Sequence, residues 1–181
     1  MRIIAFVGMP ASGKGEAAVI AKDMGYMVVN MGDVIREEVQ RLGLAITDKN
    51  LGMTGTKLRQ EEGPAAIAQR CIPGLKNIND DTAIVDGVRN IEEVYLFKKE
   101  FKDDFILINI SSSSENRHAR IKQRGREDDR FMDEKALLLR DERELGWGIN
   151  KSITKADISI ENNGTLDEFR EKIRKLMRKY R

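Results

Sequence analysis

The segment Gly8-Met-Pro-Ala-Ser-Gly-Lys14 constrains the fold of this 181-residue chain more than any other stretch. An apolar, β-branched run, Ile3–Val7, leads directly into it, and a helical pattern follows over about residues 13–24. In such a strand–loop–helix context, Gly-x-x-x-x-Gly-Lys is the pattern of a phosphate-binding loop. Its glycines let backbone N–H groups approach an anion, the helix N-terminus adds partial positive charge, and the lysine reaches the outer phosphates. The segment therefore predicts a nucleotide site, with an ordinary strand-to-helix turn as the alternative.

Two residues after the lysine depart from the commonest form of this loop. Gly15 stands where Ser or Thr is usual, and Glu16 follows in the first helical turn. A carboxylate suits the N-terminal end of a helix dipole, although it would repel a phosphate if it pointed inward. The residues that we expect to contact the donor nucleotide are Gly8, Met9, Pro10, Ala11, Ser12, Gly13, Lys14, Gly15 and Glu16.

Short apolar runs alternate with longer helical patterns along the chain. The runs are Ile3–Val7, Met27–Val29, Thr82–Val85, Phe105–Ile110 and Ile158–Ile160. The helical patterns span about residues 13–24, 32–42, 54–71, 90–101, 114–124, 132–145 and 166–179. Continuous apolar strands between helices predict a five-stranded parallel sheet covered on both faces, a three-layer α/β/α fold. The polar, weakly periodic segment 43–63 is expected to form a mobile flap.

The composition narrows the class of protein. Hydrophobic residues make up 40% and charged residues 34%, with a net charge of +2, so neither nucleic acid nor a membrane is required as a partner. A single cysteine, Cys71, excludes an intrachain disulfide and favours a reducing compartment. No apolar run approaches the ~20 residues of a membrane span. We therefore expect a cytoplasmic protein, monomeric or homodimeric, whose residues 1–181 form one domain.

The loop resembles that of adenylate kinases and their relatives, which carry Gly-x-Pro-x-x-Gly-Lys-Gly-Thr. Pro10 and Gly15 match this pattern, whereas Glu16 replaces the Thr. Further along, Asn30-Met-Gly-Asp-Val-Ile-Arg36 resembles the family's Ser-Thr-Gly-Asp-Leu-Leu-Arg. The resemblance implies that Arg36 grips the phosphate of an acceptor and that Asp33 belongs to the same site. The alternatives are a helix N-cap for Asp33 and an exposed helix face for Arg36.

A third match follows the third apolar run, because Asp86-Gly-Val-Arg89 resembles the family's Asp-Gly-Phe-Pro-Arg. The resemblance implies that Asp86 approaches magnesium through water and that Arg89 is a second acceptor-phosphate arginine. Four residues later the family places a Gln that reads adenine, but this chain has Glu93. The acceptor is then expected to carry another base or none, unless Glu93 is a solvated helix residue. Lys57 and Arg59 are further candidates to reach an acceptor.

An arginine-rich stretch, residues 116–129, resembles the sequence that leads into the lid of adenylate kinases. The match implies that Arg120 stacks over the donor base, while Arg124 and Arg126 reach the transferring phosphates from a short lid, about residues 122–132. Alternatives are a solvated helix with acidic partners or an RNA-binding strip. Arg140 and Arg143, three residues apart, are candidates for a further family arginine.

Near the carboxyl terminus, residues 156–164 resemble the Ala-Asp-x-x-Ile-x-Asn-x-Gly of small-molecule P-loop kinases, including dephospho-coenzyme A kinases. That likeness implies donor contacts at Asn163, although an Asn- and Gly-rich turn explains the residues equally well.

Taken in order, the matches place the chain nearest to an archaeal branch of adenylate-kinase-like proteins. They imply a P-loop fold with an acceptor-binding insert at about residues 31–72. They also imply Mg²⁺-dependent transfer of the γ-phosphoryl group of ATP to a small phosphorylated acceptor, above all a nucleoside monophosphate. The alternatives are a non-transferring P-loop ATPase, switch or assembly factor, or a kinase of another acceptor such as dephospho-coenzyme A.

Overall fold

A computed structural model describes residues 1–124 and 134–180, with the backbone alone for 122–124 and 134. Its five strands pair in parallel in the order β2-β3-β1-β4-β5. They are β1 (Arg2–Val7), β2 (Met27–Asn30), β3 (Thr82–Val88), β4 (Phe105–Ser111) and β5 (Ile158–Glu161). The sheet confirms the five-stranded parallel architecture that the apolar runs predict.

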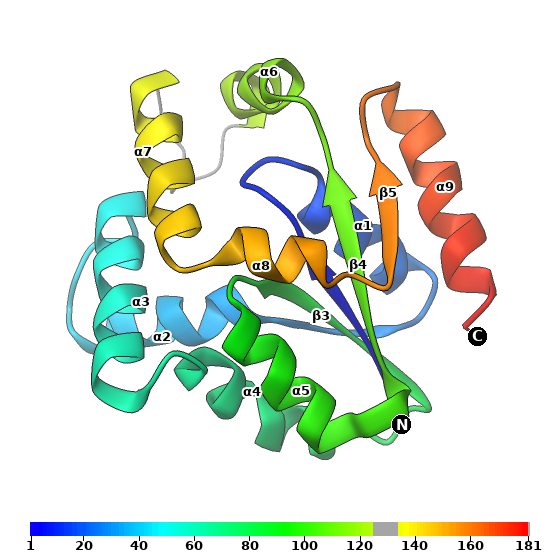
Figure 1. Ribbon diagram of the computed structural model, residues 1–181, viewed down its shortest axis with the longest axis horizontal. Coiled ribbons are helices and arrows are strands. Elements are labelled where there is room, and N and C mark those ends of the chain that lie inside the picture. Colours follow the sequence, from blue (N-terminus) through cyan, green and yellow to red (C-terminus); the bar gives the residue numbers. More distant parts are fainter. Residues whose placement is uncertain (125–133, 181) are drawn as a thin grey trace.

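Helices cover both faces of the sheet (Figure 1). One face carries α1 (Lys14–Asp23) and α9 (Leu166–Arg178). The other packs against α2 (Met31–Arg41), α3 (Asp48–Glu62), α4 (Ala66–Lys76), α5 (Ile91–Phe101) and α8 (Ile149–Thr154). A short 3₁₀ turn, Lys102–Asp104, precedes β4. The helices α6 (Ser114–Arg124) and α7 (Glu134–Gly146) come after β4. The expected three layers are thus present.

The central strand β1 explains why both faces need cover. Ile3, Ala5 and Val7 enter the core beneath α4, α5 and α8, whereas Ile4 and Phe6 enter the core beneath α1 and α9. All five side chains are fully buried. Successive strand residues point to opposite faces, so a continuous apolar run suits a strand between two helical layers.

The segment between β2 and β3 differs from expectation. The expected single helix over 54–71 is wrong, because α3 and α4 are separate helices. Most of the segment 43–63, expected as a mobile flap, forms helix α3. Thr47 caps α3 by accepting a hydrogen bond from the Asn50 N–H at 3.2 Å. Gly63, with φ of 96°, ends α3 in a conformation that favours glycine. Two glycines inside α3, at 52 and 55, weaken the apolar periodicity that sequence patterns rely on.

The carboxyl ends of the strands meet at one edge of the sheet. The glycine-rich loop follows β1 there, and α6 follows β4 close by (Figure 1). In open parallel sheets ligands bind in the crevice beyond these strand ends. Within the described ranges, no helix is long and apolar enough to cross a membrane.

Candidate active site

A cavity of about 490 Å³ opens at this edge of the sheet. Its wall is formed by the loop, by α2 and α3, by the end of β3, and by residues of α6, α7 and α9. The predicted site residues in the wall are Pro10, Ala11, Gly13, Lys14, Gly15, Glu16, Arg36, Asp86, Arg89 and Arg120. Those outside it are Gly8, Met9, Ser12, Asp33 and Asn163. The structure therefore brings ten of the predicted donor, acceptor and metal-binding residues to one cavity.

The lysine of the loop is folded back onto its own backbone. Lys14 Nζ donates to the carbonyls of Gly8 at 2.6 Å and Met9 at 3.0 Å, and the side chain is buried. Burial, with Arg89 beside it, lowers the pKa of Lys14 to about 7. Gly8 cannot carry a side chain, because a Cβ there would collide with the carbonyl oxygen of Ile110. Gly8 and Met9 thus serve the lysine through their carbonyl groups.

Arg120 and Asn162 hold the loop from the other side. Arg120 donates to Ser112 Oγ at 2.9 Å and to the Asn162 carbonyl at 2.7 Å. Asn162 Nδ2 donates to the Ser12 carbonyl at 2.9 Å, and Asn162 lines the cavity. Burial lowers the pKa of Arg120. By contrast, the Asn163 side chain accepts from the Ser113 N–H at 2.8 Å, which ties β5 to the start of α6.

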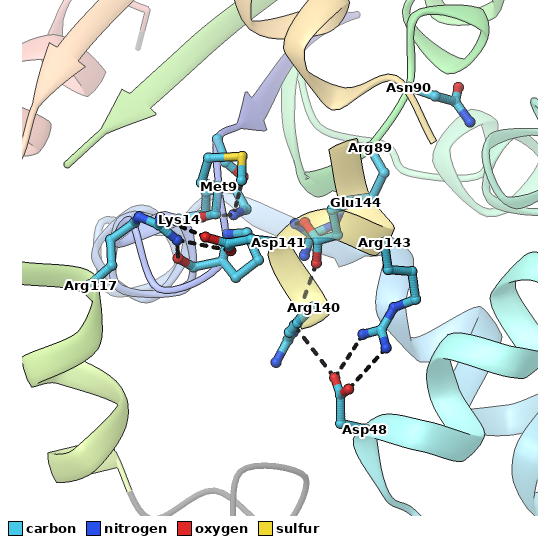
Figure 2. Close-up of polar contacts among 12 residues, drawn as sticks. Met9, Lys14, Asp48, Arg89, Asn90, Arg117, Arg140, Asp141, Arg143 and Glu144 are labelled. Carbon is cyan, nitrogen blue, oxygen red and sulfur yellow. Dashed lines mark hydrogen bonds and ion pairs between the residues drawn. The ribbon is translucent and has the colours of Figure 1, made fainter. Parts of the chain in front are cut away.

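A buried ion pair links α6 to α7 beside the loop (Figure 2). Arg117 donates to the Asp141 carboxylate through Nη1 at 2.9 Å and Nη2 at 2.6 Å. The same Arg117 donates to the Pro10 carbonyl at 3.1 Å. The loop is therefore fixed to two helices by side chains that the sequence patterns did not single out.

Glu16 lies in the described part of the chain, whereas most of the predicted lid does not. The Glu16 carboxylate pairs with Arg170 of α9 at 2.9 Å, so a cation on the protein already balances its charge. The Arg124 side chain, Arg126 and most of the expected lid 122–132 lie outside the described residues.

Asp86 stands at the end of β3 beside the loop strand. It is 7% exposed, and its Oδ1 atom has no hydrogen-bond partner among the described residues. Those residues also hold no group of three or more His, Cys, Asp or Glu side chains that could bind a metal alone. A single orphaned carboxylate oxygen fits magnesium held mainly by water and phosphate oxygens, which is the usual arrangement in kinases.

The acceptor side begins at α2. Asn30 caps this helix by accepting from the Gly32 N–H at 2.8 Å, so the N-cap alternative for Asp33 is wrong. Asp33 instead pairs with Arg36 at 2.8 Å in the first turns of the helix. Arg36 reaches the cavity wall, whereas Asp33 does not.

Arg89 joins a charged network on α7 (Figure 2). Its guanidinium donates a hydrogen bond to Glu144, which is 2% exposed and also lies 3.4 Å from Arg140 Nε. Burial raises the pKa of Glu144, but the charges of Arg89 and Arg140 outweigh burial and lower it overall. Arg143 binds Asp48 of α3 at 2.9 and 3.0 Å.

The sequence patterns missed Asp48 and Glu144. The one local signal for Glu144 is the charged spacing of residues 140–144, which places three ionisable side chains on one helix face. Asp48 pairs with a residue 95 positions away, so no local pattern could have identified it.

Glu93 is fully buried, so its reading as a solvated helix residue is wrong. One oxygen accepts from Arg59 at 2.9 Å and the other from the Arg89 N–H at 2.7 Å, while Asn90 completes a capping box for α5. Both Glu93 oxygens are therefore engaged within the protein. Arg59 stacks on Trp147 with its Cζ 4.4 Å from the ring centroid, and both residues line the cavity.

Comparisons with known proteins identify the family of this chain. A family model described as an AAA domain matches residues 7–135. The UPF0200 protein of Methanosarcina barkeri (strain Fusaro / DSM 804) is 50% identical over 180 residues, which cover 99% of this chain and 96% of that protein.

Solved structures share the fold at low sequence identity. The dephospho-CoA kinase from Campylobacter jejuni has a TM-score of 0.61 at 15% identity and covers 99% of this chain and 98% of its own. The shikimate kinase from Acinetobacter baumannii, in complex with shikimate, has a TM-score of 0.59 at 15% identity over 98% and 91% of the two chains. Together with its close archaeal relatives, these similarities show that the chain belongs to the UPF0200 family and folds as a P-loop kinase-like AAA domain.

Proposed function

We propose that the protein is an ATP-dependent kinase that transfers the γ-phosphoryl group to a small acceptor already carrying a phosphate, above all a nucleoside monophosphate. The observation that carries this proposal is one cavity with Lys14 on its donor side and Arg36 and Arg89 on its acceptor side. A transferase needs two anion sites that face each other, whereas simple hydrolysis needs one. The adenylate-kinase-like order of the motifs and the kinase names of the structural neighbours support the same activity.

On the donor side, the residues of the loop cradle the phosphates with backbone N–H groups. Lys14 exchanges the carbonyls of Gly8 and Met9 for phosphate oxygens. Arg120 and Asn163 belong to the donor-base end of the site, and Arg124 and Arg126 close over the transferring group in this proposal. Phosphoryl transfer consists mainly of positioning and charge neutralisation, which this set of groups supplies.

Asp86 would hold magnesium through water, given its orphaned Oδ1 atom. Magnesium bound with ATP neutralises phosphate charge during transfer. On the acceptor side, Arg36 and Arg89 offer planar forks that suit a phosphate. The acceptor phosphate is already ionised, so no protein base is required. With both Glu93 oxygens engaged, position 93 is not free to read adenine.

A panel of acceptors tests the proposal. Protein, Mg²⁺ and ATP are mixed with each nucleoside monophosphate, with dephospho-coenzyme A, and with no acceptor, and ADP and phosphorylated products are quantified. Acceptor-dependent product supports the kinase, and Lys14→Met should abolish it. Equal ADP release with every acceptor and with none would sink the transferase assignment.

Arg89→Ala separates the two halves of the site. Because Arg89 lies on the acceptor side, we expect its loss to raise the KM for the acceptor by about 10-fold or more, the value of a charged hydrogen bond. The Kd for ATP should change far less. Equal losses for both ligands would contradict the assignment of Arg89.

A second candidate function is a non-transferring ATPase or switch. The observation that favours it is that Arg89 and Arg143 already have carboxylate partners in Glu144 and Asp48. Such arginines can be structural rather than ligand-binding. The same panel distinguishes the two, because a switch hydrolyses ATP without regard to the acceptor.

A further inference from the structure

Asp48 lies between two arginines of α7 at the acceptor side of the cavity (Figure 2). Its carboxylate accepts from Arg143 Nη1 at 3.0 Å and Nη2 at 2.9 Å, and it lies 3.5 Å from Arg140 Nε. The Asp48 side chain is 24% exposed, so solvent screens this pair only in part. This contact connects α3, within the proposed acceptor insert, to α7, which carries the cations.

A glycine makes this contact possible. A Cβ at Gly52 would lie 2.6 Å from Arg143 Nη1 and 2.7 Å from its Cζ, too close for the guanidinium to stay where it is. Glycine inside a helix lowers stability relative to alanine. At Gly52, one turn after Asp48, the missing side chain therefore has a spatial role. Asp48 binds the Arg143 guanidinium, and Gly52 leaves the space in which that guanidinium packs against α3.

The Arg143 fork suits a phosphate as well as a carboxylate, because either can accept both N–H groups at once. Asp48 occupies the fork as part of the same chain, so its effective concentration there is high. An acceptor gains Arg143 only if its own anionic group displaces Asp48. A doubly charged phosphate can compete for the fork, whereas an uncharged hydroxyl or a sugar cannot.

We propose that Asp48 is a specificity-determining residue: its carboxylate is an intramolecular competitor that admits phosphorylated acceptors and rejects uncharged ones. This inference rests on the proposed function, because it assigns a selection step to the same acceptor site. When the phosphate takes the Arg143 fork, Asp48 is released and the contact between α3 and α7 opens. Asp48 therefore weakens acceptor binding and sharpens the choice of acceptor.

The test is an equilibrium titration with inorganic phosphate, with ADP in excess to fill the donor loop. The chain has one tryptophan, Trp147, which lines the cavity with Arg143 Cζ 5.6 Å from its ring centroid. Its fluorescence should report phosphate at the fork, with calorimetry as a second measurement. We expect Asp48→Asn to lower the Kd for phosphate by about 10-fold, a coupling of ordinary size.

Two controls separate competition from a change of net charge. Glu61→Gln removes the same charge from an exposed position of α3 and should leave the Kd for phosphate within about twofold, as a screened surface charge would. The gain from Asp48→Asn should vanish when Arg143→Gln is added. If Asp48→Asn leaves the affinity unchanged, or if its gain persists without Arg143, the proposal is overturned.

The titration needs no turnover, so its result is independent of the kinase assignment. Phosphate competition without acceptor-dependent transfer keeps the competition between Asp48 and phosphate for the Arg143 fork, but it removes the proposed function and with it the role of Asp48 in acceptor choice. Transfer with an unchanged phosphate Kd in Asp48→Asn does the reverse. Asn at 48 keeps the Thr47 cap of α3, and Asp48→Ser replaces it if thermal unfolding shows that Asp48→Asn does not fold.

Discussion

At the scale of single residues, Lys14 is a cation whose surroundings oppose its charge. Its ammonium is buried within the loop, and Arg89 and Arg140 add repulsion, while Glu144 and Asp86 offset part of it. These effects lower its pKa from 10.5 to about 7 in the protein without nucleotide. Phosphate groups of a bound nucleotide act in the opposite direction, because an opposite charge favours the protonated amine.

The first prediction concerns proton uptake. Between about pH 7 and 10.5 the free protein holds Lys14 largely neutral, and we expect the phosphates of bound ATP to raise its pKa. At pH 8 we therefore expect ATP binding to take up close to one proton, and the ATP affinity to fall as the pH rises above 7. Calorimetry in two buffers of different ionisation enthalpy measures the uptake.

Controls for this prediction lie on the same helix. Lys14→Met should bind ATP weakly and without proton uptake, whereas Lys22→Met, at an exposed position of α1, should behave as the unmodified protein. Uptake of the same size in Lys14→Met, or none in the unmodified protein, would contradict the role of Lys14.

The residues of the site differ in how well the sequence predicts them. Lys14 and its glycines follow from a local motif, because a phosphate loop is built from consecutive residues. Asp48 is defined by its contact with Arg143 of α7, and Glu144 by its contact with Arg89 just after β3, and both contacts depend on the tertiary fold. A single sequence does not show which charged residues that are distant along the chain form contacts in the fold.

At the scale of elements, α5 depends on a buried charge. Glu93 caps the helix, accepts from the Arg89 backbone and pairs with Arg59, whose side chain is 8% exposed. Removing one partner of a buried ion pair leaves the other charge without compensation. Glu93 therefore affects the site as well as stability, since its partners Arg59 and Arg89 both line the cavity.

We predict that Glu93→Gln lowers the free energy of unfolding by about 3 kcal/mol, because Arg59 stays buried without its counter-charge. Urea unfolding measures the change. Glu92→Gln is the matched control, since Glu92 is the exposed neighbour in the same helix turn and should change stability by less than about 0.5 kcal/mol. Equal stability of the two variants would show that the buried pair contributes little.

The elements themselves were predicted unevenly. Five of the expected helices, 13–24, 32–42, 90–101, 114–124 and 166–179, match α1, α2, α5, α6 and α9 within one residue at each end. In α5 and α9 the apolar positions repeat with the helical period. The pattern failed at α3, whose interior glycines add no apolar side chain: Gly52 faces Arg143, and Gly55 faces Ile35 and Arg59. The short α8 was not predicted at all, since six residues are too few to show a period.

At the scale of the whole molecule, the fold was predictable because two signals agreed: alternating strand and helix patterns, and a loop motif with a fixed strand–loop–helix context. The placement of α3 against α7 was not predictable, because it rests on the Asp48–Arg143 pair and on Trp147.

The central strand β1 also couples the two halves of the molecule, since alternate residues enter both cores. We therefore predict that the protein unfolds in one cooperative transition, with coincident curves from far-ultraviolet circular dichroism and Trp147 fluorescence. MgATP at about 100 times its Kd should stabilise the whole molecule by about 2.7 kcal/mol, and Lys14→Met should show no such gain. An earlier transition in Trp147 fluorescence alone would mean that the acceptor insert, about residues 31–72, unfolds as a separate unit. Such a result would contradict the single-domain organisation, because the insert would then unfold independently of the sheet and of the glycine-rich loop.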